Sequence, residues 1–138
     1  MKHWTRFAFV LLFVPIVASA QFRDLDAAMS NLERGFGSGD VDAIVSGIGA
    51  GDQVMLQFPG LTDKEGFFGK DQAAYLLDGL FNKTKPSGFE RLSAKGARSE
   101  GQYHIKARWT TSQGDRDLYI TLQQKDGRWT VASVKSGS

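Results

Sequence analysis

The stretch YHIKARWTTSQGDRDLYITLQQKDGRWTVASV, residues 103–134, decides the fold. Apolar and polar residues alternate along it with a period of two, which is typical of β-strands. Two turn sequences interrupt the alternation, SQGD at residues 112–115 and KDG at residues 125–127. An Asp-Gly pair supplies the positive φ values that a tight hairpin requires. The stretch therefore predicts three antiparallel strands with one apolar face and one polar face, and the apolar face needs a cover of helices.

Upstream of this stretch, apolar residues recur mostly at the spacing of amphipathic helices. The predicted elements are a helix from about residue 25, a second after Asp40, a strand at 53–58, a short return strand at 66–69, a third helix at about 71–81 and a strand at 89–98. Helices on one side and a meander of strands on the other define an α+β domain. We expect a curved antiparallel sheet packed on about three N-terminal helices.

The first twenty residues have the pattern of an export signal. Lys2, His3 and Arg6 precede an apolar run at residues 7–17, and Ala18-Ser19-Ala20 is a small-x-small cleavage sequence. We expect residues 1–20 to be a signal peptide and residues 21–138 to be a single exported domain, periplasmic or secreted. The apolar run is too short to anchor the mature protein in a membrane.

The composition excludes several kinds of chemistry. Lys2 and Arg6 leave with the signal peptide, so the remaining chain has 15 basic and 15 acidic residues and shows no basic stripe for nucleic acid. The chain has no cysteine, which removes disulfides, thiolate nucleophiles and cysteine metal sites. With one histidine after residue 20 and no clustered carboxylates, the sequence predicts no metal and no cofactor.

Four short stretches carry a resemblance to a known superfamily. They are GDV at 39–41, GFFGKDQA at 66–73, LF at 80–81 and the segment 89–96. On these the chain resembles the nuclear transport factor 2-like superfamily, also called the SnoaL-like or cystatin-like α+β cone, and within it a family of small exported bacterial domains of unknown function. The resemblance implies one cone-shaped domain with a pocket between the inner sheet face and the helices. It also implies a homodimer through the outer sheet face, as members often form.

Catalysis is disfavoured by the residues available. His104 is the only histidine after residue 20, and the alternation places it on the face opposite Trp109. A general acid–base mechanism needs two titratable groups that converge on one pocket, and the inner strand positions are apolar or small. We assign no catalytic residue. The alternative is a small lyase or isomerase of the SnoaL-like type that uses an Asp or Tyr.

Aromatic residues give the strongest signal for binding. The predicted pocket residues are Phe58, Phe67, Phe68, Tyr75 and Trp109. Pockets for small molecules are mainly hydrophobic and aromatic, but aromatic residues at period-two spacing also form cores, and the sequence leaves both interpretations open. The predicted interface residues on the polar face are His104, Lys106, Arg108, Tyr119 and Thr121, for which an ordinary solvated face is the alternative.

Two glycine runs, at residues 35–39 and 47–51, resemble a dinucleotide-binding motif at first sight. That motif must follow a strand and open a helix. Both runs follow helical patterns, so they predict helix ends and turns. The leading hypothesis is an exported non-catalytic domain that binds a small apolar ligand or a protein partner through its cone pocket or sheet face.

Overall fold

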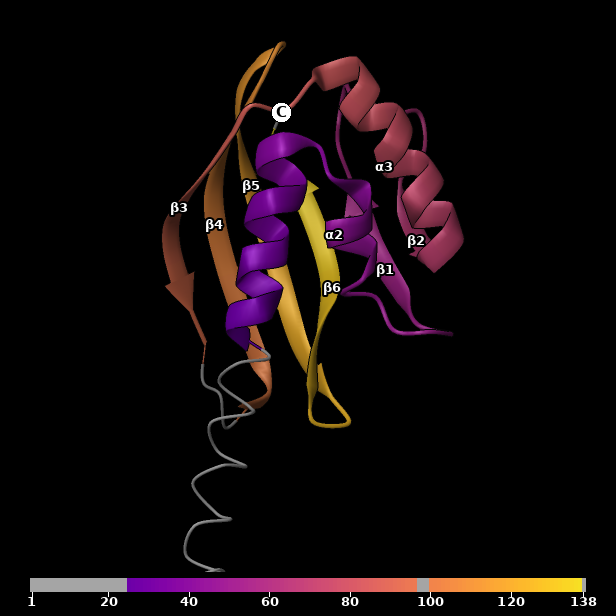
Figure 1. The fold of residues 1–138 in the computed structure, drawn as a ribbon, viewed down its shortest axis with the longest axis vertical. Coiled ribbons are helices and arrows are strands. Elements are labelled where there is room, and N and C mark those ends of the chain that lie inside the picture. Colours follow the sequence, from indigo (N-terminus) through magenta and orange to yellow (C-terminus); the bar gives the residue numbers. More distant parts are fainter. Residues whose placement is uncertain (1–24, 97–99, 138) are drawn as a thin grey trace, which may run out of the picture.

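The computed structural model describes residues 25–96 and 100–137. Six strands form one sheet in the order β2-β1-β6-β5-β4-β3, and the helices lie against one face of it (Figure 1). The elements are a helix at residues 25–38, α2 (Val41–Val45), β1 (Gln53–Gln57), β2 (Gly66–Gly69), α3 (Lys70–Thr84), β3 (Gly88–Lys95), β4 (Gln102–Thr111), β5 (Gly114–Lys125) and β6 (Arg128–Ser136). Because β2 and β3 lie at opposite edges, the curved sheet does not close. The predicted α+β class is confirmed.

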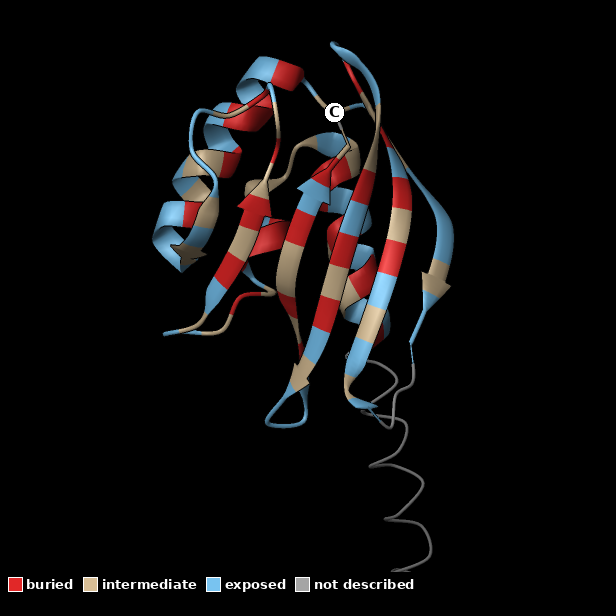
Figure 2. Cartoon of the chain, turned by 180° about the vertical axis from the view of Figure 1, so that it is seen from behind, coloured by how far each residue is buried: buried red, intermediate tan, exposed pale blue. Residues whose placement is uncertain are grey.

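The opening stretch forms β4, β5 and β6 as the alternation predicted. Their register pairs Ile105 with Ile120 and Ile120 with Val134, so buried apolar side chains line up across three strands. The β5–β6 hairpin turns at Asp126 and Gly127, whose φ values are 53° and 75°. Figure 2 shows the alternation of buried and more exposed positions along these strands, seen from the side away from the helices.

One pairing in the sheet is not antiparallel. β1 runs parallel to β6, with Met55 opposite Ser133 and Leu56 opposite Val134. The last strand of the chain therefore lies between β1 and β5, near the centre of the sheet. The β1–β2 hairpin joins the meander through this single parallel pair.

Local sequence explains where the helices begin and end. Asp40 caps α2, since its side chain accepts a hydrogen bond from the Ala43 N–H. Gly39 has a φ of +77°, the left-handed conformation in which helices often end. The run at residues 47–51 follows α2 and leads into β1 rather than into a helix. Both glycine runs are thus helix ends and turns, as predicted.

The described residues contain no helix that is long and apolar enough to cross a membrane. The predicted signal peptide at residues 1–20 lies outside the described ranges.

Candidate functional site

The space between the helices and the inner face of the sheet is filled by aromatic side chains around Trp109. We call Phe36, Phe58, Phe81 and Trp109 the aromatic cluster. The Trp109 ring is 5.7 Å from that of Phe36, 6.2 Å from that of Phe58 and 6.3 Å from that of Phe81, centroid to centroid. Trp109, Phe36 and Phe58 have no exposed surface. These rings form part of the hydrophobic core.

A hydrogen bond ties the aromatic cluster to the end of the first helix. The Trp109 Nε1–H donates to the carbonyl oxygen of Phe36 over 2.8 Å. Phe36 lies in the last turn of the helix at residues 25–38, where carbonyl groups lose their helical partners. The indole supplies the missing donor, so the helix end is fixed on the sheet at this point.

The five residues predicted to line one pocket lie in two separate places. Phe58 and Trp109 belong to the aromatic cluster, where neighbouring rings occupy the space that a ligand would need. Phe67, Phe68 and Tyr75 lie instead along an open groove beside α3. The prediction of a single shared pocket is therefore corrected: burial separates the five residues into a core pair and a surface group.

This α3 groove runs between α3 and the segment 61–68, and its volume is about 870 Å³. Two aromatic side chains on it are highly exposed, Tyr75 at 86% and Phe67 at 68%. The groove is lined by Leu61, Thr62, Asp63, Lys64, Phe67, Phe68, Asp71, Gln72, Tyr75, Leu76, Gly79, Leu80 and Lys83. It is a surface feature of the helix and the sheet edge, outside the aromatic cluster.

Helical geometry explains why Tyr75 faces outward. α3 buries Ala73, Leu77 and Leu80 on one face. At about 100° per residue, Tyr75 lies roughly 200° around the helix from Ala73. The apolar spacing in the sequence already contained this information, because the stripe that defines the helix leaves Tyr75 on the opposite side.

The five predicted interface residues do share one surface. His104, Lys106 and Arg108 on β4 lie opposite Thr121, Tyr119 and Asp117 on β5. The His104 Nδ1 is 3.1 Å from the Thr121 Oγ1, and the Lys106 Nζ is 5.9 Å from the centre of the Tyr119 ring. This outer sheet face has a shallow recess of about 250 Å³ and leaves Tyr119 47% exposed. Its use as an interface stays a prediction.

The positions of the tyrosines and the histidine bear on catalysis. The side chains of Tyr75 and His104 are exposed, so neither lies in a dry cavity where acid–base groups are tuned. Tyr103 is partly buried and packs against the hydrophobic core. In the described part of the chain, no three His, Cys, Asp or Glu side chains gather closely enough to hold a metal ion.

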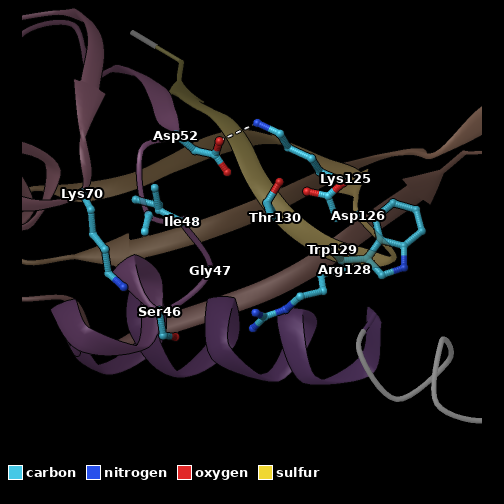
Figure 3. Close-up of a pocket in the computed structure, with 12 residues that line it drawn as sticks. Ser46, Gly47, Ile48, Asp52, Lys70, Lys125, Asp126, Arg128, Trp129 and Thr130 are labelled. Atoms are coloured by element: carbon cyan, nitrogen blue, oxygen red, sulfur yellow. Dashed lines mark hydrogen bonds and ion pairs between the residues drawn. The ribbon is translucent and has the colours of Figure 1, made fainter.

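Sequence reasoning missed a second recess, at the β5–β6 hairpin. We call it the hairpin recess. It has a volume of about 450 Å³, and charged side chains from three distant segments line it, among them Asp52, Lys70 and Arg128 (Figure 3). The only local signal was the glycine run at 47–51, which we interpreted as a turn. Its charged residues come together only when α2, α3 and the hairpin pack.

The comparisons with known proteins fit this geometry. A family model described as "Domain of unknown function (DUF4783)" matches residues 29–135. A crystal structure of a DUF4783 family protein from Bacteroides ovatus is 17% identical, covers 77% of this chain and 90% of that chain, and has a TM-score of 0.66. One from Bacteroides uniformis is 12% identical, covers 79% and 94%, and has a TM-score of 0.68.

A structure described as NTF2-like supports the wider resemblance. An NTF2-like protein of unknown function from Shewanella baltica is 12% identical, covers 86% of this chain and 94% of that chain, and has a TM-score of 0.62. The search of curated proteins found no match. At these identities the structures show a shared fold, and the family model places the sequence more closely. The chain belongs to the DUF4783 family of domains of unknown function, and its fold is NTF2-like.

Proposed function

We propose that this protein is an exported, non-catalytic binding module that holds an extended segment of a partner protein in the α3 groove. The observation that carries the proposal is the exposure of Tyr75 and Phe67, 86% and 68%, along one groove. Large aromatic side chains supply much of the binding energy at protein interfaces. Burial of such large exposed aromatic side chains by a partner would contribute strongly to the free energy of binding.

The position of β2 at the edge of the sheet is an argument for a partner segment in extended conformation. β2 is an edge strand that pairs with β1 in the described sheet, which leaves the backbone groups on its other side for a further strand. Peptides commonly bind by adding a strand to such an edge, and pockets for alternate side chains then provide specificity. Phe67 and Phe68 lie on β2 itself and both line the α3 groove, so a peptide on this edge would contact their aromatic side chains.

The charges of the groove favour a partner with apolar side chains. Asp63 and Asp71 balance Lys64 and Lys83 among the lining residues, so no charge of one sign dominates. The Lys83 Nζ donates to the Leu61 carbonyl over 3.3 Å, which ties the end of α3 to the loop on the other side of the groove. This hydrogen bond links the two walls at one end of the groove.

A small apolar ligand in the cone is the weaker alternative. Such ligands bury most of their surface in an enclosed cavity, whereas Trp109 and its neighbours fill the interior and the α3 groove is open. An open groove is better matched to a peptide segment, which can make many small contacts along its length.

Selection of displayed peptides tests the proposal. The purified protein is used to select from a phage library of random twelve-residue peptides. We expect enriched peptides with apolar residues at every second position, and a loss of binding of about 10-fold or more in a Phe67→Ser, Tyr75→Ser double variant. Leu92→Ser, an exposed apolar position on β3 at the opposite edge of the sheet, is the matched control and should bind normally. Binding that survives in the double variant, or selection without an apolar pattern, would refute the assignment.

Export is tested separately. Residues 1–25 are fused to alkaline phosphatase that lacks its own signal, since this enzyme is active only after it leaves the bacterial cytoplasm. We expect activity from the fusion and none after Phe9→Arg and Leu12→Arg interrupt the apolar run. Equal activity with and without these charges would contradict export through residues 1–20.

The homodimer through the outer sheet face is a second, separate prediction. Sedimentation of the purified protein at increasing concentration measures it. We expect Tyr119→Glu to weaken any dimer, because it places a charge at an exposed aromatic position on that face. A protein that sediments as a monomer at all concentrations would exclude this dimer.

A further inference from the structure

We infer that the hairpin recess is a binding site for a small organic anion, one that carries a phosphate or carboxylate group. The recess is independent of the α3 groove and of the proposed partner. Its volume of about 450 Å³ falls in the range of pockets that hold small molecules. It lies between the loop after α2, the first residue of α3 and the β5–β6 hairpin (Figure 3).

The charged side chains of the recess do not cancel. Lys70, Lys125 and Arg128 face the two carboxylates of Asp52 and Asp126. The Lys125 Nζ pairs with the Asp52 carboxylate over 2.5 Å. The hydrogen bond and the charge of Asp52 raise the pKa of Lys125, so this lysine is charged and already has its partner. Lys125 and Asp52 are therefore already paired with each other.

Lys70 and Arg128 are the cations left for a ligand. Neither forms an ion pair within 4.0 Å with a carboxylate of residues 25–96 or 100–137. They reach the recess from different elements, Lys70 from the start of α3 and Arg128 from β6. Figure 3 shows both side chains extending towards the end of the recess where Ser46 lies, while the Lys125–Asp52 pair lies at the other end. An anion at this end of the recess would therefore lie close to two positive charges that come from different elements.

The floor of the recess is well packed and partly apolar. Ile48 is 2% exposed and Trp129 is 8% exposed, so these two side chains are fixed in the core while they border the recess. The Val131 N–H donates to the Gly47 carbonyl over 2.9 Å, which joins the loop to β6. A ligand that carries an organic body beside its anionic group would therefore find an apolar surface next to the two cations.

Glycine at position 49 allows this arrangement. A Cβ atom there would collide with the carboxylate of Asp52. Without it, the Asp52 side chain folds back against its own loop and meets Lys125 from the hairpin. The ion pair thus joins the hairpin to the loop at the end of the recess away from Lys70 and Arg128.

Calorimetric titration of the purified protein tests the inference. The probes are inorganic phosphate, glucose 1-phosphate, galacturonate and, as the neutral control, glucose. We expect binding of the phosphate-bearing probes or of the carboxylate probe but not of glucose, and the binding probes identify the anionic group. Each of Lys70→Ala and Arg128→Ala should weaken binding about 10-fold, because each removes one charge-assisted hydrogen bond.

Lys135→Ala, a variant of an exposed lysine on β6 outside the recess, is the matched control and should bind as the wild type does. Raising the salt concentration should weaken binding in the wild type, since exposed charges are screened. Failure of all three anions to bind, or equal affinity in the Lys70, Arg128 and Lys135 variants, would overturn the inference. Neither result would affect the α3 groove, whose test uses other residues and other ligands.

Discussion

Replacing Trp109 by phenylalanine is expected to lower the free energy of unfolding by about 2–4 kcal/mol. The smaller ring leaves a void of roughly 40 Å³, which at about 24 cal/mol per Å³ costs about 1 kcal/mol. The change also removes the Nε1–H that donates to the Phe36 carbonyl over 2.8 Å. A buried carbonyl without its donor costs about 1–3 kcal/mol. In a continuing helix the Asp40 N–H would donate to the Phe36 carbonyl. This N–H instead donates to the Gly35 carbonyl, so it does not replace the lost indole donor.

Urea denaturation followed by far-ultraviolet circular dichroism measures this loss without relying on tryptophan emission. Trp129→Phe is the matched control: this indole also lies in the core but keeps 8% of its surface exposed. We expect the control to cost about 1 kcal/mol, from the lost packing alone. If Trp109→Phe costs no more than Trp129→Phe, then the hydrogen bond from Trp109 to Phe36 does not secure the helix end.

A cavity variant provides an independent check on the filled interior. Trp109→Ala is expected to cost about 3–5 kcal/mol and to leave an apolar hole. Added indole should recover part of this loss, since engineered apolar cavities bind aromatic molecules. The wild-type protein should gain no stability from indole. Stabilisation of the wild type by indole would mean that the interior has room for a ligand after all.

The remaining predictions concern the hairpin recess and the helices. Asp52→Asn should lower the pKa of Lys125 towards its ordinary value, as measured by NMR of the lysine Cε, and Gly49→Ala should act in the same direction by displacing Asp52. The folded-state pKa of Lys125 is raised, so the stability that the pair adds is present below the unfolded pKa and is lost as pH rises through the folded value. Gly39→Ala should cost about 1–2 kcal/mol in thermal unfolding because its φ is +77°, whereas Gly79→Ala, in α3 with open space around it, should add about 0.5–1 kcal/mol.

Two outcomes would contradict these expectations. An unchanged Lys125 pKa in Asp52→Asn would show that the ion pair does not persist in solution. Equal effects of the two glycine variants would show that backbone conformation is not what distinguishes the two sites.

Local patterns were sufficient to predict the elements that depend on neighbours in sequence. The alternation from Tyr103 onward predicted β4, and the Asp126-Gly127 pair predicted the turn between β5 and β6. The apolar stripe predicted a third helix at about 71–81, and α3 extends it to Lys70–Thr84. In each case the residues that determine the structure lie within a few positions of each other in the sequence.

Features that depend on distant segments could not be predicted in this way. Period-two spacing shows which face of the sheet Trp109 occupies, but its burial depends on Phe36, which lies 73 residues earlier. The same limit applies to the parallel pairing of β1 with β6 and to the meeting of Lys70 with Arg128. The exposure of Tyr75 is different, because the apolar stripe of α3 already places Tyr75 on the opposite side of the helix.

The central place of β6 in the sheet has a consequence for biosynthesis. While a ribosome is still making the segment before Arg128, the β1–β2 hairpin has no strand through which to join β5. A nascent chain at that stage lacks a continuous sheet, and the helices have no complete surface on which to pack. Folding must therefore wait until nearly all the described residues have emerged, and contacts that span most of a chain form slowly. Such a delay keeps the polypeptide unfolded for longer, which is compatible with the export proposed above.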